Sequence, residues 1–112
     1  MVVYGIKNCD SVKKARAFLE LNQLNYRFHD YRLDGLDSEL LQTLIDALGL
    51  EAVLNQRSTS WRQLTDEQKQ DLTVEKALAL MLAQPALIKR PILQVGQRWL
   101  VGFNSDLYQT LL

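Results

Sequence analysis

The sequence predicts an α/β protein in which a four-stranded mixed sheet carries helices and is interrupted by an inserted helical block. Two short apolar segments, at residues 2–6 and 26–31, flank a helical pattern over about residues 10–24. Two more strand-like segments lie between residues 92 and 101, around a glycine-containing turn. The stretch between these two groups of strands carries only helical patterns. We therefore expect a mixed α/β (α+β) fold, in which helices separate the two pairs of strands along the sequence.

The first three elements form a β-α-β unit. The helix at about 10–24 has its apolar positions on one side, at Val12, Ala15, Phe18 and Leu19. Two strands joined through one helix are expected to pair in parallel with a right-handed crossover.

The helical block begins after a turn at residues 33–36. Asp37 or Ser38 can cap the first helix, whose apolar stripe ends before Gly49. The following pieces are short: residues 50–54, then a polar break at 57–60, then a capping box formed by Thr65 and Gln68. Thr73 caps a further apolar helix that ends near Pro85.

The last third of the chain changes to a strand period. Residues 92–95 and 98–101 flank Gly96 and Gln97, which predicts an antiparallel hairpin. Asn104 or Ser105 then caps a closing helix. Without the helical block, the order is the thioredoxin-like arrangement. We expect one domain over residues 1–112, with a thioredoxin-like core at about 1–34 and 86–112 and a helical insertion at about 35–85.

Composition narrows the range of functions. The 13 basic and 13 acidic residues balance, so no overall field favours binding of nucleic acid or of a membrane surface. A single cysteine fits a reducing, cytoplasmic compartment. One histidine and one cysteine cannot assemble a tetrahedral zinc site, so no metal is expected. We expect a monomer.

The single cysteine, Cys9, lies where the first strand turns into the first helix. A thiol at a helix start faces unpaired backbone N–H groups and the positive end of the helix dipole, and both favour the reactive thiolate. Lys13, Lys14 and Arg16 add positive charge to the same half of the helix. A lone cysteine is also commonly an inert buried hydrophobe, and on these residues alone both interpretations stay open.

Arg90 and Pro91, which precede the third strand, form the second informative segment. In thioredoxin-like folds a proline at this point usually adopts the cis form and faces the reactive thiol, which would place both residues beside Cys9. Arg90 could then hold a carboxylate or oxyanion with two parallel donors. The alternative is that Pro91 only begins an edge strand and that Arg90 is solvated.

Three segments resemble the ArsC/Spx group, and most closely its small YffB-type branch. They are YGIKNCDSVKKA at residues 4–15, RSTSWR at 57–62 and IKRPI at 88–92. The resemblance covers the whole chain. It implies a thioredoxin-like fold with a helical insert, a nucleophilic cysteine at Cys9, and an arginine next to a cis proline at Arg90 and Pro91.

Two departures separate the chain from other branches of that group. Arsenate reductases of the ArsC type hold the oxyanion with three arginines; Arg90 fills one place, but Asn55 and the region of Gly102 are uncharged. Arg57, two residues past Asn55, could substitute in part. The Spx branch binds RNA polymerase and often carries a Cys-x-x-Cys switch, whereas the fourth position here is Val12.

These observations predict a glutathione-dependent thiol-disulfide oxidoreductase of the monothiol kind. One thiol can attack a disulfide, but an external thiol must resolve the mixed disulfide, and glutathione is the candidate co-substrate. Cys9 is the expected nucleophile, and no bound cofactor is expected. The alternatives are an Spx-like binding module and an arsenate or oxyanion reductase; glutaredoxin and RNA polymerase are the candidate protein partners. The expected binding residues are Asn8, Lys13, Arg57, Arg90 and Pro91.

Overall fold

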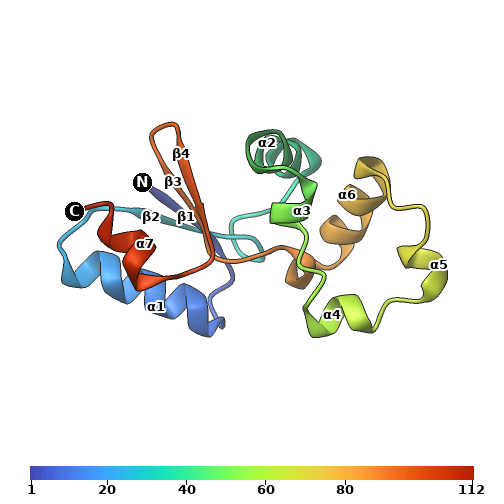
Figure 1. The fold of residues 1–112 in the computed structure, drawn as a ribbon, viewed down its shortest axis with the longest axis horizontal. Helices are drawn as coiled ribbons and strands as arrows, with labels where there is room; N and C mark the ends of the chain where they lie inside the picture. The colour runs from blue at the N-terminus through green and yellow to red at the C-terminus, as the bar shows by residue number, and fades with distance from the viewer. The chain divides into compact units, whose positions relative to one another are not determined.

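A computed structural model describes all residues, 1–112, and divides them into two compact units (Figure 1). The first unit comprises residues 1–35 and 90–112, and the second comprises residues 36–89. The first unit contains β1 (Val2–Gly5), α1 (Asp10–Leu21), β2 (Arg27–Asp30), β3 (Ile92–Val95), β4 (Arg98–Val101) and α7 (Ser105–Gln109). The second contains α2 (Ser38–Leu48), α3 (Leu50–Val53), α4 (Thr59–Arg62), α5 (Asp66–Lys69), α6 (Val74–Ala83) and the short 3-10 helix η1 (Pro85–Leu87).

The four strands form one mixed sheet in the order β2-β1-β3-β4. β1 pairs with β2 in parallel, through the α1 crossover, and with β3 in antiparallel orientation. β3 and β4 form the predicted hairpin. Its turn needs the positive φ of Gly96, 59°, which a residue without a Cβ adopts without strain. The predicted fold class, a four-stranded mixed sheet with a helical insertion, is confirmed.

α1 approaches β1 closely at Gly5. A Cβ at this position would lie 2.7 Å from Cγ2 of Val12, so only glycine allows the helix to pack at this distance. The helix ends at Leu21, three residues before the expected end at residue 24. The reason is local: Asn22 is the C-cap, and Gln23 has a positive φ of 58° that cannot continue a helix.

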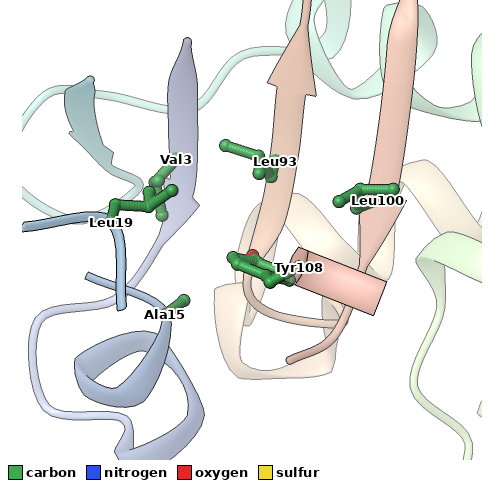
Figure 2. Close-up of a cluster of buried hydrophobic side chains, with 6 residues drawn as sticks. All are labelled: Val3, Ala15, Leu19, Leu93, Leu100 and Tyr108. Atoms are coloured by element: carbon green, nitrogen blue, oxygen red, sulfur yellow. The ribbon is translucent and has the colours of Figure 1, made fainter. Parts of the chain in front are cut away.

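Both helices of the first unit cover the same face of the sheet. Figure 2 shows side chains from three strands, Val3, Leu93 and Leu100, meeting Ala15 and Leu19 of α1 and Tyr108 of α7. Five of these side chains are fully buried, and Leu100 is 4% exposed. Burial of each valine and leucine side chain of this cluster contributes about 1.5–3 kcal/mol, which makes the cluster the main support of the sheet.

In the second unit, polar caps determine where the short helices begin. Asp37 caps α2 by accepting a hydrogen bond from the Leu40 amide, which decides between the two candidates Asp37 and Ser38. The predicted capping box of Thr65 and Gln68 is present, and Thr73 caps α6. The apolar sides of these helices form the interior of the unit: Leu41, Leu44, Ile45, Val53, Leu64, Ala77, Met81, Leu87 and Ile88.

The closing helix α7 is capped by Asn104, which decides between the two candidate caps Asn104 and Ser105. The side chain of Asn104 accepts hydrogen bonds from the amides of Asp106 and Leu107. None of the helices is long and apolar enough to cross a membrane.

Candidate functional site

Three chain segments meet at one edge of the sheet in the first unit. β1 and β2 run in parallel with Gly5 opposite Asp30, so the segments after both strands leave the sheet at the same edge. β3 runs the other way with Ile92 opposite Tyr4, so residues 90–91 enter at that edge as well. The pairing therefore brings the turn with Cys9, the end of β2 and the Arg90–Pro91 segment to one edge.

Cys9 is the N-cap residue of α1. Its backbone is extended, with φ −118° and ψ 127°, and its carbonyl accepts a hydrogen bond of 2.9 Å from the Lys13 amide. The Cys9 side chain makes no capping hydrogen bond. The N–H groups of the first turn of α1 also have no acceptor within the helix. The Cys9 side chain is free and half-buried. This position allows both access for a substrate and electrostatic support for a thiolate.

The charges on α1 are divided between two sides. Lys13 and Lys14 are exposed. Arg16, which the sequence grouped with these lysines, instead donates a hydrogen bond of 2.9 Å to the Tyr26 hydroxyl and lies 4.2 Å from the Phe28 ring centre. Arg16 therefore has a structural contact with β2 and its preceding loop.

The Arg90–Pro91 peptide bond is cis, as expected. Pro91 is buried, Arg90 is half-buried, and the Pro91 carbonyl accepts a hydrogen bond of 2.8 Å from the Gly102 amide. β3 pairs on both sides, with β1 and β4, so the alternative that Pro91 begins an edge strand is wrong.

The Arg90 charge acts on a buried phenol at the same edge. Burial raises the pKa of the Tyr31 hydroxyl, the neighbouring Tyr4 adds to the increase, and the positive charge of Arg90 partly offsets it. Tyr31 is 2% exposed and its ring stacks on that of Tyr4, with centroids 6.4 Å apart. Tyr31 thus belongs to the surroundings of Arg90.

Asn8 lines a depression of about 200 Å³ on the first unit. The other lining residues come from the turn after β1 and the loop after β2: Ile6, Lys7, Asp30, Arg32 and Leu33. Asn8 itself is exposed.

Arg57 lies in the second unit. It is exposed and lines a separate depression of about 360 Å³, together with Asn55 and Lys89. The Asn55 side chain accepts a hydrogen bond of 3.1 Å from the Arg57 amide, so this residue shapes the loop. Arg57 and Lys89 supply two cationic side chains to the same depression.

Sequence reasoning missed Asp30 and Tyr31. Asp30 has the only buried carboxylate, 3% exposed, and accepts hydrogen bonds from three backbone amides. The available signal was a charged residue at the end of a predicted strand, next to an aromatic residue. Strand-end carboxylates are common in turns, so this signal does not reveal which loop the side chain binds.

Comparison of this chain with known protein families and solved structures gives the same fold and family. Residues 4–111 match the sequence profile of the ArsC family. A solved YffB protein is 49% identical, with a TM-score of 0.91 and coverage of 97% of this chain and 96% of that chain. An arsenate reductase (ArsC) related protein from Brucella melitensis is 40% identical, with a TM-score of 0.80 and coverage of 97% and 91%.

A more distant relative has a regulatory name. The global transcriptional regulator Spx of Lactiplantibacillus plantarum is 26% identical over 108 residues, which are 95% of this chain and 81% of the relative. The profile match over nearly the whole chain and the two related structures lead to one conclusion: the protein belongs to the ArsC family.

Proposed function

We propose that the protein is a glutathione-dependent thiol-disulfide oxidoreductase that works with one thiol. The observation that carries this proposal is the position of Cys9 in a member of the ArsC family. Cys9 is the half-buried N-cap residue of α1, and its side chain makes no capping hydrogen bond. Cys9 is also the only cysteine of the 112 residues, so no second thiol of this chain can resolve a disulfide.

The reaction has two exchange steps. The Cys9 thiolate attacks the glutathione sulfur of a mixed disulfide R–S–S–G, forms a Cys9–glutathione disulfide, and releases RS⁻, which takes up a proton. The thiolate of a second glutathione then attacks the glutathione sulfur of that adduct and releases Cys9 as thiolate together with oxidised glutathione. Together, the two steps convert R–S–S–G and one glutathione thiol into R–SH and oxidised glutathione, so the disulfide passes from the substrate to glutathione and no external oxidant is needed.

The cations around the site fit a substrate of this kind. Glutathione carries two carboxylates and one ammonium group, so it is a net anion. Lys13 is exposed on the first turns of α1, and Arg90 precedes β3 at the same sheet edge as the Cys9 turn. We assign carboxylate binding to these two side chains, a groove-forming role to Asn8 and Pro91, and a weaker binding role to Arg57.

Mass spectrometry after incubation with oxidised glutathione tests this function. We expect one glutathione adduct, located on Cys9, that free glutathione removes. With free glutathione present, we also expect multiple turnovers of a small mixed disulfide. Cys9→Ser is the matched control and should give neither adduct nor turnover. An unmodified wild-type protein under the same conditions would refute the proposal.

The similarity to Spx favours a second candidate, a protein-binding regulator related to the RNA polymerase-binding branch. A pull-down with RNA polymerase, performed with wild type and Cys9→Ser, distinguishes it. Equal retention of polymerase by both variants, without thiol transfer by the wild type, would favour the regulator.

Arsenate reduction is the third candidate, because the Brucella relative is described as related to an arsenate reductase. Asn55 stands where we align an oxyanion-binding arginine, so we expect no arsenate turnover with glutathione and glutaredoxin. Measurable turnover that depends on Cys9 would make this the better assignment.

A further inference from the structure

The buried carboxylate of Asp30 divides its two oxygens between two different loops. One oxygen, Oδ1, accepts hydrogen bonds from the amides of Arg32 and Leu33, at 2.8 and 3.2 Å, within its own loop. The other, Oδ2, accepts a hydrogen bond of 3.1 Å from the Lys7 amide, 23 residues away in the sequence. A buried charge is stable only when such donors replace water, and here three amides do so.

Asp30 is itself held firmly. It ends β2 opposite Gly5, and the next residue, Tyr31, donates a hydrogen bond of 2.9 Å to the Gly5 carbonyl. Its own amide donates a hydrogen bond of 2.8 Å to Oδ2 of Asp34. Lys7, in contrast, lies in the turn between β1 and α1, outside both elements, and its amide is bound by the Asp30 carboxylate. The carboxylate therefore connects an anchored strand end to the turn that carries Cys9.

We propose that Asp30 is a positioning residue for the reactive turn. It fixes Lys7 and thereby the entry of the chain into the N-terminus of α1, whose N-cap residue carries the thiol. This inference rests on the proposed function only for the choice of Cys9 as the reacting group; the hydrogen bond to Lys7 and its effect on Cys9 can be measured without any substrate.

Charge and position have opposite effects on Cys9, which makes the role testable. By charge alone, a carboxylate bonded to the same turn opposes ionisation of the thiol, so its removal should make Cys9 react at lower pH. If Asp30 acts by position, its removal should displace the thiol from the positive end of the α1 dipole, and Cys9 should react only at higher pH.

Asp30→Asn separates these two effects. The single amide oxygen can still accept from Arg32 and Leu33, which saves two hydrogen bonds, while the NH₂ group then faces the Lys7 N–H and cannot accept from it. Asp34→Asn is the matched control, because it removes one charge from the same loop and leaves the hydrogen bond to Lys7 intact. Both variants retain Arg90 at the same sheet edge and the ionisable side chains of the turn and of the first helical turns: Lys7, Asp10, Lys13, Lys14 and Arg16.

The experiment measures the rate of Cys9 alkylation by iodoacetamide across pH, together with amide hydrogen exchange by nuclear magnetic resonance. For Asp30→Asn we expect half-maximal alkylation at higher pH and at least about tenfold faster exchange of the Lys7 amide, the equivalent of one lost hydrogen bond. For Asp34→Asn we expect neither change. A shift to lower pH, or no change in either quantity, would overturn the positioning role.

If Asp30→Asn does not fold, amide hydrogen exchange of the wild type tests the hydrogen bond between Asp30 and Lys7. The wild-type Lys7 amide should exchange at least about tenfold more slowly than the amide of Asn8 in the same turn, because, of the two, only the Lys7 amide is bound by the Asp30 carboxylate. Equal exchange of the two amides would refute the hydrogen bond. If the wild type transfers no glutathione while Asp30→Asn still moves half-maximal alkylation of Cys9 to higher pH, the proposed function is contradicted and the positioning role of Asp30 stands.

Discussion

The turn that carries Cys9 and the loop that carries Arg57 are both polar, and both precede a helix, yet they are held in different ways. In the first unit, the Cys9 turn is bound by Asp30, a residue 23 positions away. In the second unit, the backbone amide of Asn55 donates a hydrogen bond to the Leu87 carbonyl. The loop after Asn55 is held by local contacts. The Asn55 side chain accepts from the Arg57 amide, and Ser58 caps α4 by accepting from the Trp61 amide.

The difference is that a buried charge from another element supports one segment, whereas the other, after its backbone hydrogen bond to Leu87, is supported by short-range polar contacts of exposed or half-buried residues. Short-range contacts re-form easily after a fluctuation, while a tether across the sheet edge depends on the whole first unit. Catalytic groups require a position that is accurate to about 0.5 Å, so the tethered turn is better suited to hold a reactive group. Five predictions test this contrast.

The largest effect is expected from Cys9→Ser. It should reduce glutathione transfer by on the order of 10³-fold or more, because the hydroxyl is a far weaker nucleophile and no second cysteine can replace it. The free energy of unfolding should change by less than about 0.5 kcal/mol at this half-buried site. A turnover assay and chemical denaturation check both values; retained turnover would identify another reacting group.

Arg90→Ala and Arg57→Ala compare the two cationic candidates directly. We expect Arg90→Ala to slow adduct formation with oxidised glutathione by about 10–100-fold, the value of one charged hydrogen bond. Arg57→Ala should change it by no more than about threefold, as is typical of an exposed charge. Arg90→Lys should recover only part of the rate, because lysine cannot offer two parallel donors. Equal effects of the two alanine variants would remove the contrast.

Gly5→Ala tests the support beneath the Cys9 turn. The added Cβ would lie 2.7 Å from Cγ2 of Val12, and we expect a loss of about 1–3 kcal/mol of unfolding free energy. The cost should fall when Val12→Ala removes the opposing methyl groups, which a double-mutant cycle measures. Additive effects of the two substitutions would mean that the contact is not the cause.

Alkaline pH should weaken the first unit selectively, because its residues include all four tyrosines of the chain. Burial raises the pKa of Tyr108 from 10.0 to about 12, so the unfolded state loses this proton first. Stability from this group is therefore complete below pH 10 and is lost as the pH rises towards 12. Tyr108→Phe should flatten the decline.

The two tryptophans allow this pH effect to be assigned to one unit. Trp99 lies in β4 of the first unit and Trp61 in α4 of the second, so the fluorescence of Trp61→Phe and Trp99→Phe variants follows each unit separately. A decline of the same size in Tyr108→Phe as in the wild type would show that other groups cause it.

The smallest effect is expected from Asn55→Ala. It removes one side-chain hydrogen bond of 3.1 Å to the Arg57 amide, and we expect a cost of about 0.5–1.5 kcal/mol in unfolding free energy. Trp61 fluorescence in a Trp99→Phe background gives the measurement. Slower adduct formation on Cys9, beyond the about threefold limit for Arg57→Ala, would contradict the local role of this loop.

Much of the fold could be predicted because its signals are local. The glycine turn at Gly96, the capping box of Thr65 and Gln68, and the start of α7 at Asn104 or Ser105 each depend on a few neighbouring residues. The end of α1 was placed three residues too late, since the apolar pattern continued while Gln23 adopted a left-handed backbone. Helix ends depend on single residues whose conformation the apolar pattern does not reveal.

The candidate site was predictable only in part. Cys9 could be identified because a cysteine at a strand-to-helix turn is informative without partners, and Arg90 and Pro91 because they resemble a family segment. The contacts of Arg16 with Tyr26 and Phe28 could not be predicted, since these residues belong to another strand and its preceding loop. Asp30 was missed because its partner Lys7 is distant in the sequence.

The sequence by itself determined the order of strands and helices, the helix caps and the single thiol, since each depends on residue type and short-range spacing. Only the tertiary structure decided that a carboxylate at the end of β2 binds the turn before α1, and that the charge of Arg90 acts on the Tyr31 phenol. The physical reason is that strand pairing sets which chain segments share a sheet edge. A buried side chain then binds the donors that this pairing brings within reach.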